Sequence, residues 1–252
     1  MIKTLFARLK QGYRTIPFPI DAKALPERYL GRPFISADIS EEDVKKCELV
    51  CPTGAFGKNN ERFTLDLGKC LFCGECQKAC SDKVVSFSRD YCLAAENRSD
   101  LLISSVLAAR KKEFNKKVRH IFDRSLKLRQ VSAGGCNACE ADINVLNTLS
   151  FDLGRFGIQF VASPRHADGI VVTGPVTKNM RLALEKTYAA IPAPKLVIAV
   201  GACAISGGPY RGHQEANNGV DSIIPVDLYV PGCPPHPLTI LDGLIKIMGK
   251  DL

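Results

Sequence analysis

Eight of the eleven cysteines fall into two sets of four, and each set has the spacing of iron–sulfur cluster ligands. The compact set consists of Cys51, Cys70, Cys73 and Cys76. The dispersed set consists of Cys136, Cys139, Cys203 and Cys233. Four cysteine thiolates are the usual ligands of one 4Fe–4S cluster. The sequence therefore predicts two such clusters, and two clusters in one chain are typical of proteins that transfer electrons.

The compact set carries the C-x2-C-x2-C spacing of bacterial ferredoxins, in which the fourth cysteine of each motif ligates the cluster of the other motif. One motif is complete from Cys70 to Cys80, whereas only Cys47 and Cys51 remain of the other. By this crossing rule Cys51 completes the set that begins at Cys70, while Cys47 and Cys80 lack the partners for a second cluster. We therefore predict one ferredoxin-type cluster. A zinc site is the alternative, although this spacing is unusual for zinc.

The dispersed set lies where strand and helix patterns alternate along the chain. Strands are predicted at 126–131, 157–161, 169–173, 196–200 and 226–230, and helices at 141–149, 177–190 and 237–248. Such alternation predicts a doubly wound parallel sheet. Cys136, Cys203 and Cys233 each follow a strand, and ligands in open α/β sheets gather beyond the carboxyl ends of the strands. We therefore expect these cysteines to meet at one edge of the sheet.

The sequence before this region changes character several times. An amphipathic stretch and several prolines open the chain, which predicts an extended arm that packs on its own domain or docks on a partner. Short strand patterns at 63–67 and 84–87 surround the compact set. We divide the chain into a docking arm (1–40), a small α+β ferredoxin-like domain (41–90), a basic helical linker (91–125) and the α/β domain (126–252).

The net charge of +8 is concentrated around the linker. Nine Lys or Arg residues and two acidic residues lie between Arg110 and Arg129, which gives this segment a charge of +7. Such a patch attracts nucleic acid, anionic lipid or an acidic partner, and the alternative is a solvated helix face. The lack of Trp and an aromatic content of 7% argue against a surface that stacks nucleobases, so no nucleic-acid partner is expected.

Two features of the sequence bear on location. No apolar run reaches the length of about 18 residues that a membrane-spanning helix needs. Residues 1–14 lack the apolar stretch and cleavage site of a secretory signal. We therefore expect a cytoplasmic protein, because thiols stay reduced there and clustered cysteines bind metals instead of forming disulfides.

Several motifs around the dispersed set match a known family. They are GGCNACE at 134–140, RFGI at 155–158, ASPRHAD at 162–168, TGPVT at 173–177, GAC at 201–203 and PVDLYVPGCPP at 225–235. On these motifs the chain resembles the small electron-transfer subunit of energy-converting, group 4, formate hydrogenlyase-like nickel–iron hydrogenases. It is also similar to the homologous cluster-bearing subunit of respiratory complex I. In the complex I subunit the first two cysteines are adjacent, whereas Cys136 and Cys139 are spaced as in the hydrogenases.

The resemblance implies a flavodoxin-like fold for the C-terminal part and a proximal 4Fe–4S cluster on Cys136, Cys139, Cys203 and Cys233. The N-terminal half resembles the ferredoxin-type subunit of the same complexes, on its cysteines and on the leader at 13–19 and 30–33. The chain is therefore interpreted as a fusion of two neighbouring subunits. It departs from the family in lacking half of one ferredoxin motif.

The resemblance also implies a function and its partners. The chain would relay electrons through two 4Fe–4S clusters to or from the large subunit of a membrane-associated nickel–iron hydrogenase complex. The other soluble and membrane subunits would hold it peripherally on the cytoplasmic face of the inner membrane. Nickel is bound by the large subunit in this family, so no active site is expected here. The alternative is the same role in a complex I-like or hydrogenase-related quinone oxidoreductase without nickel. A free ferredoxin-like carrier is a further, less favoured interpretation.

Four other side chains near the cysteine motifs are candidates for supporting roles. Glu140 either relays protons or is a carboxylate in the first turn of a helix, where the helix dipole favours it. His166 is interpreted as structural, and the role of His236 is left open. Cys92 is expected to be a small apolar residue.

Overall fold

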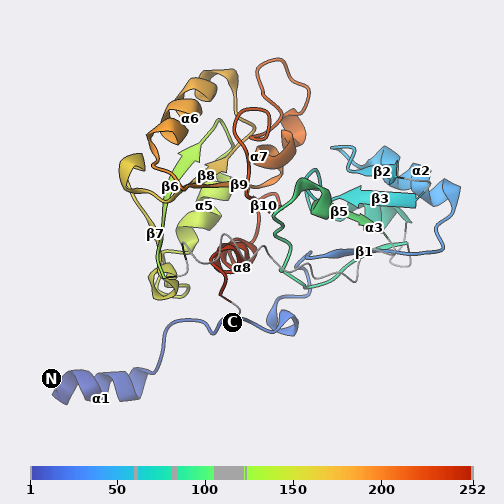
Figure 1. Ribbon diagram of the computed structural model, residues 1–252. Helices are drawn as coiled ribbons and strands as arrows, with labels where there is room; N and C mark the ends of the chain where they lie inside the picture. Colours follow the sequence, from blue (N-terminus) through green and yellow to red (C-terminus); the bar gives the residue numbers. More distant parts are fainter. Residues whose placement is uncertain (1, 60–61, 81–83, 105–121, 123, 251–252) are drawn as a thin grey trace.

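The computed structural model describes residues 2–59, 62–80, 84–104, 122 and 124–250 (Figure 1). Within these residues the largest sheet has five parallel strands, β6 (Leu126–Ser132), β7 (Ile158–Phe160), β8 (Gly169–Thr173), β9 (Leu196–Val200) and β10 (Leu228–Val230). Across the sheet they lie in the order β10-β9-β8-β6-β7. This is the 2-1-3-4-5 order of flavodoxin, counted along the chain, so the sheet is compatible with the predicted flavodoxin-like fold.

The predicted strands at 169–173 and 196–200 coincide with β8 and β9, and every residue of both strands is buried. This burial is the reason that they appear in the sequence as continuous apolar runs. The last strand begins at Leu228, two residues later than predicted. Asp227, the residue before this strand, donates its N–H to the Val197 carbonyl at 2.9 Å. Its carboxylate accepts the Val197 N–H at 2.8 Å, so the Asp227 side chain takes the place of a backbone carbonyl in the pairing with β9.

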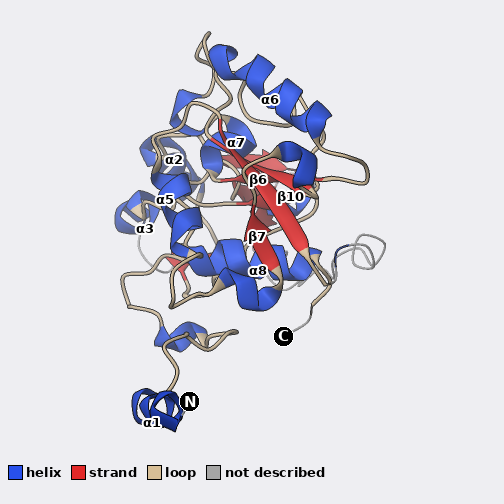
Figure 2. Ribbon diagram, turned by 90° about the vertical axis from the view of Figure 1, so that its left-hand side faces the viewer, coloured by secondary structure: helices blue, strands red, loops and turns tan. Residues whose placement is uncertain are grey.

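Helices cover both faces of this sheet (Figures 1 and 2). They are α5 (Ala138–Val145), α6 (Lys178–Ala190), α7 (Ala202–Ser206) and α8 (Pro237–Ile247). Ile170 and Val172 of β8 share a core with residues of α6 and α7, whereas Val171 packs with α5 and α8. The helix predicted from residue 141 begins at Ala138, because Asn137, with a φ of 70°, turns the chain directly after the cysteine loop.

The compact set lies in a smaller α+β unit. Its elements are β1 (Pro33–Ile35), α2 (Glu41–Val50), β2 (Phe56–Asn59), β3 (Arg62–Asp66), α3 (Glu75–Cys80), β4 (Val85–Phe87) and β5 (Leu102–Ser104). β1 pairs with β4, and β2, β3 and β5 form a second antiparallel sheet. Ser40 caps α2, because its hydroxyl accepts a hydrogen bond from the Asp43 N–H at 3.1 Å. That this unit is ferredoxin-like remains a sequence-based prediction.

The N-terminal segment begins with α1 (Ile2–Gln11), which stands away from the rest of the chain in both views (Figures 1 and 2). The chain then runs along the α/β unit, where Ile16 donates its N–H to the Ser150 carbonyl at 2.8 Å. Leu25 packs with Tyr91 and Leu238 in a small separate core.

None of the helices in the described ranges is both long and apolar enough to cross a membrane. Short 3-10 turns complete the elements: η1 (Ala22–Ala24), η2 (Arg98–Leu101), η4 (Leu153–Phe156), η5 (Pro164–His166) and η6 (Gly208–Tyr210).

The two units share one hydrophobic core, which places their cysteine sets close together. Ala95 pairs with Tyr229 through two backbone hydrogen bonds of 3.0 and 2.8 Å and so covers the outer edge of β10. Gly68 of the smaller unit lies so close to Ile205 of α7 that an added Cβ would come within 2.7 Å of it. Most of the predicted basic linker, including Lys111, Lys112, Lys116 and Lys117, lies outside the described residues.

Two candidate iron–sulfur sites

The four cysteines of the compact set line a single small cavity. Cys51 follows the end of α2, Cys70 and Cys73 lie in the loop between β3 and α3, and Cys76 lies in α3. Backbone N–H groups point at two of these sulfurs, since Ala55 donates to Cys51 Sγ and Phe72 donates to Cys70 Sγ, each at 3.3 Å. Such bonds stabilise negative charge on sulfur and tune iron–sulfur clusters.

The surroundings of this cavity disfavour free thiolates. Burial and, to a smaller extent, the neighbouring thiols of the set raise the pKa of Cys70 to about 12 and that of Cys76 to about 11. Thiols in such surroundings ionise when a metal supplies positive charge. Four convergent sulfurs, a cavity between them and N–H donors aimed at them therefore fit a bound cluster.

Cys47 and Cys80 do not line the cavity of the compact set. Their Sγ atoms lie 2.7 Å from each other, between α2 and α3, and both side chains are buried. Cys80 also points its thiol at the Asp43 carbonyl at 3.5 Å. These two cysteines, which the spacing leaves without a complete ligand set, are thus neighbours in the fold.

The dispersed set gathers beyond the carboxyl ends of the parallel strands. Cys136 follows β6, Cys139 lies in α5, Cys203 lies in α7 directly after β9, and Cys233 follows β10. Burial, and after it the charges of Cys233 and Cys136, raise the pKa of Cys203 to about 11, so these sulfurs are within electrostatic reach of one another. Burial likewise raises the pKa of Cys139, and the neighbouring charges of Glu140, Cys203 and Cys233 contribute to the rise.

The backbone at Gly201 lies close to one of these sulfurs. Gly201, the residue between β9 and α7, has a φ of +92°, and a Cβ on it would lie 2.6 Å from Cys139 Sγ. Any side chain here would therefore be strained and would press on a ligand. Cys136 and Cys233 are exposed, so the dispersed site opens to the protein surface. The donor set and the glycine cradle fit a 4Fe–4S cluster.

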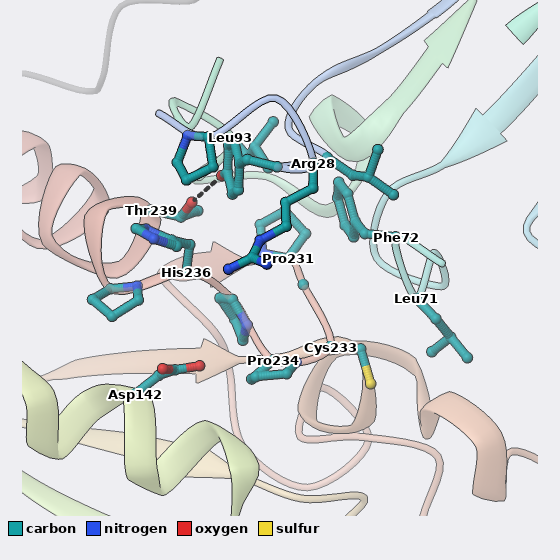
Figure 3. A pocket seen from close by; sticks show the side chains of 16 residues that line it. Arg28, Leu71, Phe72, Leu93, Asp142, Pro231, Cys233, Pro234, His236 and Thr239 are labelled. Carbon is teal, nitrogen blue, oxygen red and sulfur yellow. Dashed lines mark hydrogen bonds between the residues drawn. The ribbon is translucent and has the colours of Figure 1, made fainter. Parts of the chain in front are cut away.

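The two sites adjoin each other. Burial raises the pKa of Cys233, and both Cys136 of its own set and Cys73 of the compact set contribute to the rise. Phe72, in the loop of the compact set, and Cys233 line the same cleft of about 500 Å³, together with Arg28 of the arm and His236 (Figure 3). The cleft therefore lies at the junction of the arm and both cysteine sets, a position that the sequence did not indicate.

Glu140 is only 5% exposed, which the sequence did not anticipate. Its Oε1 atom accepts hydrogen bonds from Ser132 Oγ at 2.5 Å and from Thr173 Oγ1 at 2.6 Å. Burial by itself raises the pKa of Glu140, but these hydroxyls outweigh it and the net pKa is lowered. The carboxylate thus joins α5 to the ends of β6 and β8 beside Cys139, in addition to its place in the first helical turn.

The histidines lie in structural settings. His166 is exposed on the η5 turn before β8, at the end of the sheet opposite the cysteines. His236 precedes α8, and its Nδ1 accepts a hydrogen bond from the Leu238 N–H at 3.2 Å. Its ring packs edge-on against Tyr29 at 5.1 Å. Cys92 packs, partly buried, against the small core of Leu25, Tyr91 and Leu238, as a small apolar residue would. Its thiol also donates to the Asp242 carboxylate at 3.5 Å, and burial raises its pKa to about 12.

In the described part of the chain no group of three or more His, Cys, Asp or Glu side chains has the geometry to hold a single metal ion. The assignment of the eight cysteines to two clusters therefore rests on their spacing, their convergence and the chemistry of the donors around them.

Comparison with known proteins gives a family for the α/β unit. Residues 136–247 match the family described as NADH ubiquinone oxidoreductase, 20 Kd subunit. The chain is 43% identical over 127 residues to a probable membrane-bound hydrogenase subunit, mbhJ, of Pyrococcus furiosus, which covers 50% of this chain and 76% of the relative. Formate hydrogenlyase subunit 7 of Escherichia coli is 40% identical over 149 residues, covering 59% of this chain and 57% of the relative.

A third relative bears the name of a quinone-linked complex. An NADH-quinone oxidoreductase subunit of Heliobacterium modesticaldum is 42% identical over 119 residues, covering 47% of this chain and 68% of the relative. The similarity to these relatives confirms the resemblance seen in the cysteine and glycine motifs of the C-terminal half. The chain belongs to the family of NADH ubiquinone oxidoreductase 20 Kd subunits.

Proposed function

We propose that the chain is an electron-transfer subunit that carries two 4Fe–4S clusters. One cluster would be held by Cys51, Cys70, Cys73 and Cys76, and the other by Cys136, Cys139, Cys203 and Cys233. Bound clusters of this kind supply one-electron redox chemistry. The observation that carries the proposal is the adjacency of the two sets, since Phe72, which lies between Cys70 and Cys73, and Cys233 line the same cleft.

The large subunit of the complex would dock where the dispersed set opens to the surface. Cys136 and Cys233 are exposed, which is unusual for cluster ligands unless a partner covers them. The same contact would exclude water from the cluster. The smaller unit, which carries the compact set, would face the electron donor.

We propose a hydrogenase-type partner first, and a complex I-like quinone oxidoreductase as the second candidate. Two of the relatives are named as hydrogenase and formate hydrogenlyase subunits, and Cys136 and Cys139 have the spacing of that group. The second candidate is supported by the sequence identity to the NADH-quinone oxidoreductase subunit, which is similar to the identity to the hydrogenase subunits. In both cases the catalytic site would belong to another subunit. The chain would be held on the cytoplasmic face of the membrane by its partners.

Purification of the tagged chain from its native membranes under anaerobic conditions tests this function. We expect a large subunit and membrane subunits to be recovered with it, together with hydrogen turnover from an artificial donor. The Cys233→Ser variant should assemble but lose that turnover, whereas Cys92→Ser should retain it. Recovery of the chain alone and without redox activity of either kind would contradict the proposal. Quinone reduction without hydrogen turnover would select the second candidate.

A further inference from the structure

Helix α1 is a formed helix, and none of the residues that the structure describes buries any part of it. Its four apolar side chains, Ile2, Leu5, Phe6 and Leu9, are between 61% and 74% exposed, and none of its residues is buried. Its end is well defined, because Gly12, with a φ of +64°, donates its N–H to the Arg8 carbonyl at 2.9 Å. A ten-residue helix alone in water is marginal, so α1 needs a surface to stabilise it.

The chemistry of α1 identifies that surface. The apolar residues recur at the spacing of one helical face. Lys3 and Lys10 flank this face on one side and Arg8 flanks it on the other, while the opposite side carries uncharged residues. When such a helix lies on a lipid membrane, its apolar face enters the acyl region, and lysines and arginines along both borders of that face reach the lipid headgroups.

The charge of the whole segment has one sign. Residues 2–20 contain no Asp or Glu, and the first acidic side chain is Asp21. Tyr13, 81% exposed, follows the helix with the Arg8 guanidinium 5.0 Å from its ring, which adds an amphipathic aromatic group at the same border. A protein partner would require acidic groups matched to each cation, whereas an anionic lipid surface meets all of them at once.

We propose that α1 lies in the plane of an anionic membrane, with Ile2, Leu5, Phe6 and Leu9 in the acyl boundary and its lysines and arginine on the headgroups. The chain thereby makes a lipid contact of its own, besides any attachment through partner subunits. The proposal does not depend on the clusters or on the identity of the complex.

Flotation of the full, cluster-loaded chain with lipid vesicles tests the proposal. The probes are vesicles of phosphatidylcholine alone and vesicles that also contain phosphatidylglycerol, each at low and high salt. We expect binding to the anionic vesicles and a marked weakening at high salt. The Phe6→Glu variant should bind at least about tenfold more weakly. A Lys3→Glu, Lys10→Glu double variant should lose the preference for anionic vesicles.

The matched control is Leu182→Glu, because Leu182, like Phe6, is a large apolar side chain exposed on a helix, at 58%, but lies on α6. It should change vesicle binding less than about twofold. Unchanged iron content and circular dichroism confirm that each variant folds, as expected for side chains outside the core. Equal binding of the wild type and Phe6→Glu would overturn the proposal. The proposal would also be overturned if the chain did not bind vesicles of either kind and instead self-associated or bound a protein through α1.

Discussion

The compact and dispersed cysteine sets are positioned by two different kinds of structure. The compact cysteines lie within residues 51–76, directly after α2, in a loop and in α3, beside sheets whose strands have three to five residues. The dispersed cysteines span residues 136–233 and are placed by the ends of strands in a sheet of which β8 and β9 are entirely buried. Local sequence thus brings the first set together, and the packing of a large core brings the second.

The difference predicts unequal dependence on metal. The parallel sheet buries its own apolar residues, so its fold is stabilised by packing before any ligand binds. The smaller unit is built on strands of only three to five residues, and Cys70 and Cys76 are themselves part of its buried core, where burial disfavours ionised thiols. Binding energy of a metal to such a site becomes folding energy. The smaller unit should therefore depend on its cluster more than the α/β unit does.

The largest effect is expected for Cys70→Ser. It should remove about four iron per chain and destabilise the smaller unit by about 3 kcal/mol or more. Iron analysis and hydrogen exchange of the β3 and β5 amides measure both effects. Cys47→Ser is the matched control, since Cys47 is also a buried cysteine of this unit but does not line the cavity. It should retain all the iron, and equal iron loss in the two variants would contradict the ligand assignment.

Cys233→Ser should have the same effect on iron but a smaller one on stability. We expect the loss of about four iron per chain, because one ligand of the dispersed set is gone. Protection of the β8 and β9 amides from hydrogen exchange should fall by less than about 1 kcal/mol, since those strands are stabilised by their own core. If the α/β unit unfolds as readily as the smaller unit does in Cys70→Ser, the contrast between the two sites is wrong.

A smaller effect is expected for Gly201→Ala. The new Cβ would press on Cys139 Sγ and adopt a left-handed φ, which costs about 1–3 kcal/mol. Iron should fall at the dispersed site alone, which electron paramagnetic resonance of the reduced protein can resolve. Gly57→Ala, at a position with open space around it, serves as the control and should leave both signals unchanged.

The sequence predicted those parts of the molecule that its local patterns determine. The continuous apolar runs at 169–173 and 196–200 became β8 and β9, and the strand–cysteine order placed three ligands at one sheet edge. The family similarity then supported the α/β assignment independently.

Features that depend on tertiary contacts could not be predicted in this way. The carboxylate of buried Glu140 is satisfied by hydroxyls of Ser132, on the preceding strand, and of Thr173, 33 residues away, which only the folded sheet brings to it. The proximity of Cys47 and Cys80 depends on how α2 packs on α3. The early start of α5 depends on a left-handed Asn137, which no periodicity reveals.

The central claim is that two complete cysteine sets hold two clusters and that Cys47 and Cys80 hold none. Iron and acid-labile sulfide analysis of the anaerobically reconstituted full chain tests it most directly. We predict about eight of each per chain, four for each cluster. A value of about four would show that one set does not assemble a cluster. A value of about twelve would show that Cys47 and Cys80 help to hold a third, and either result would contradict the two-cluster assignment.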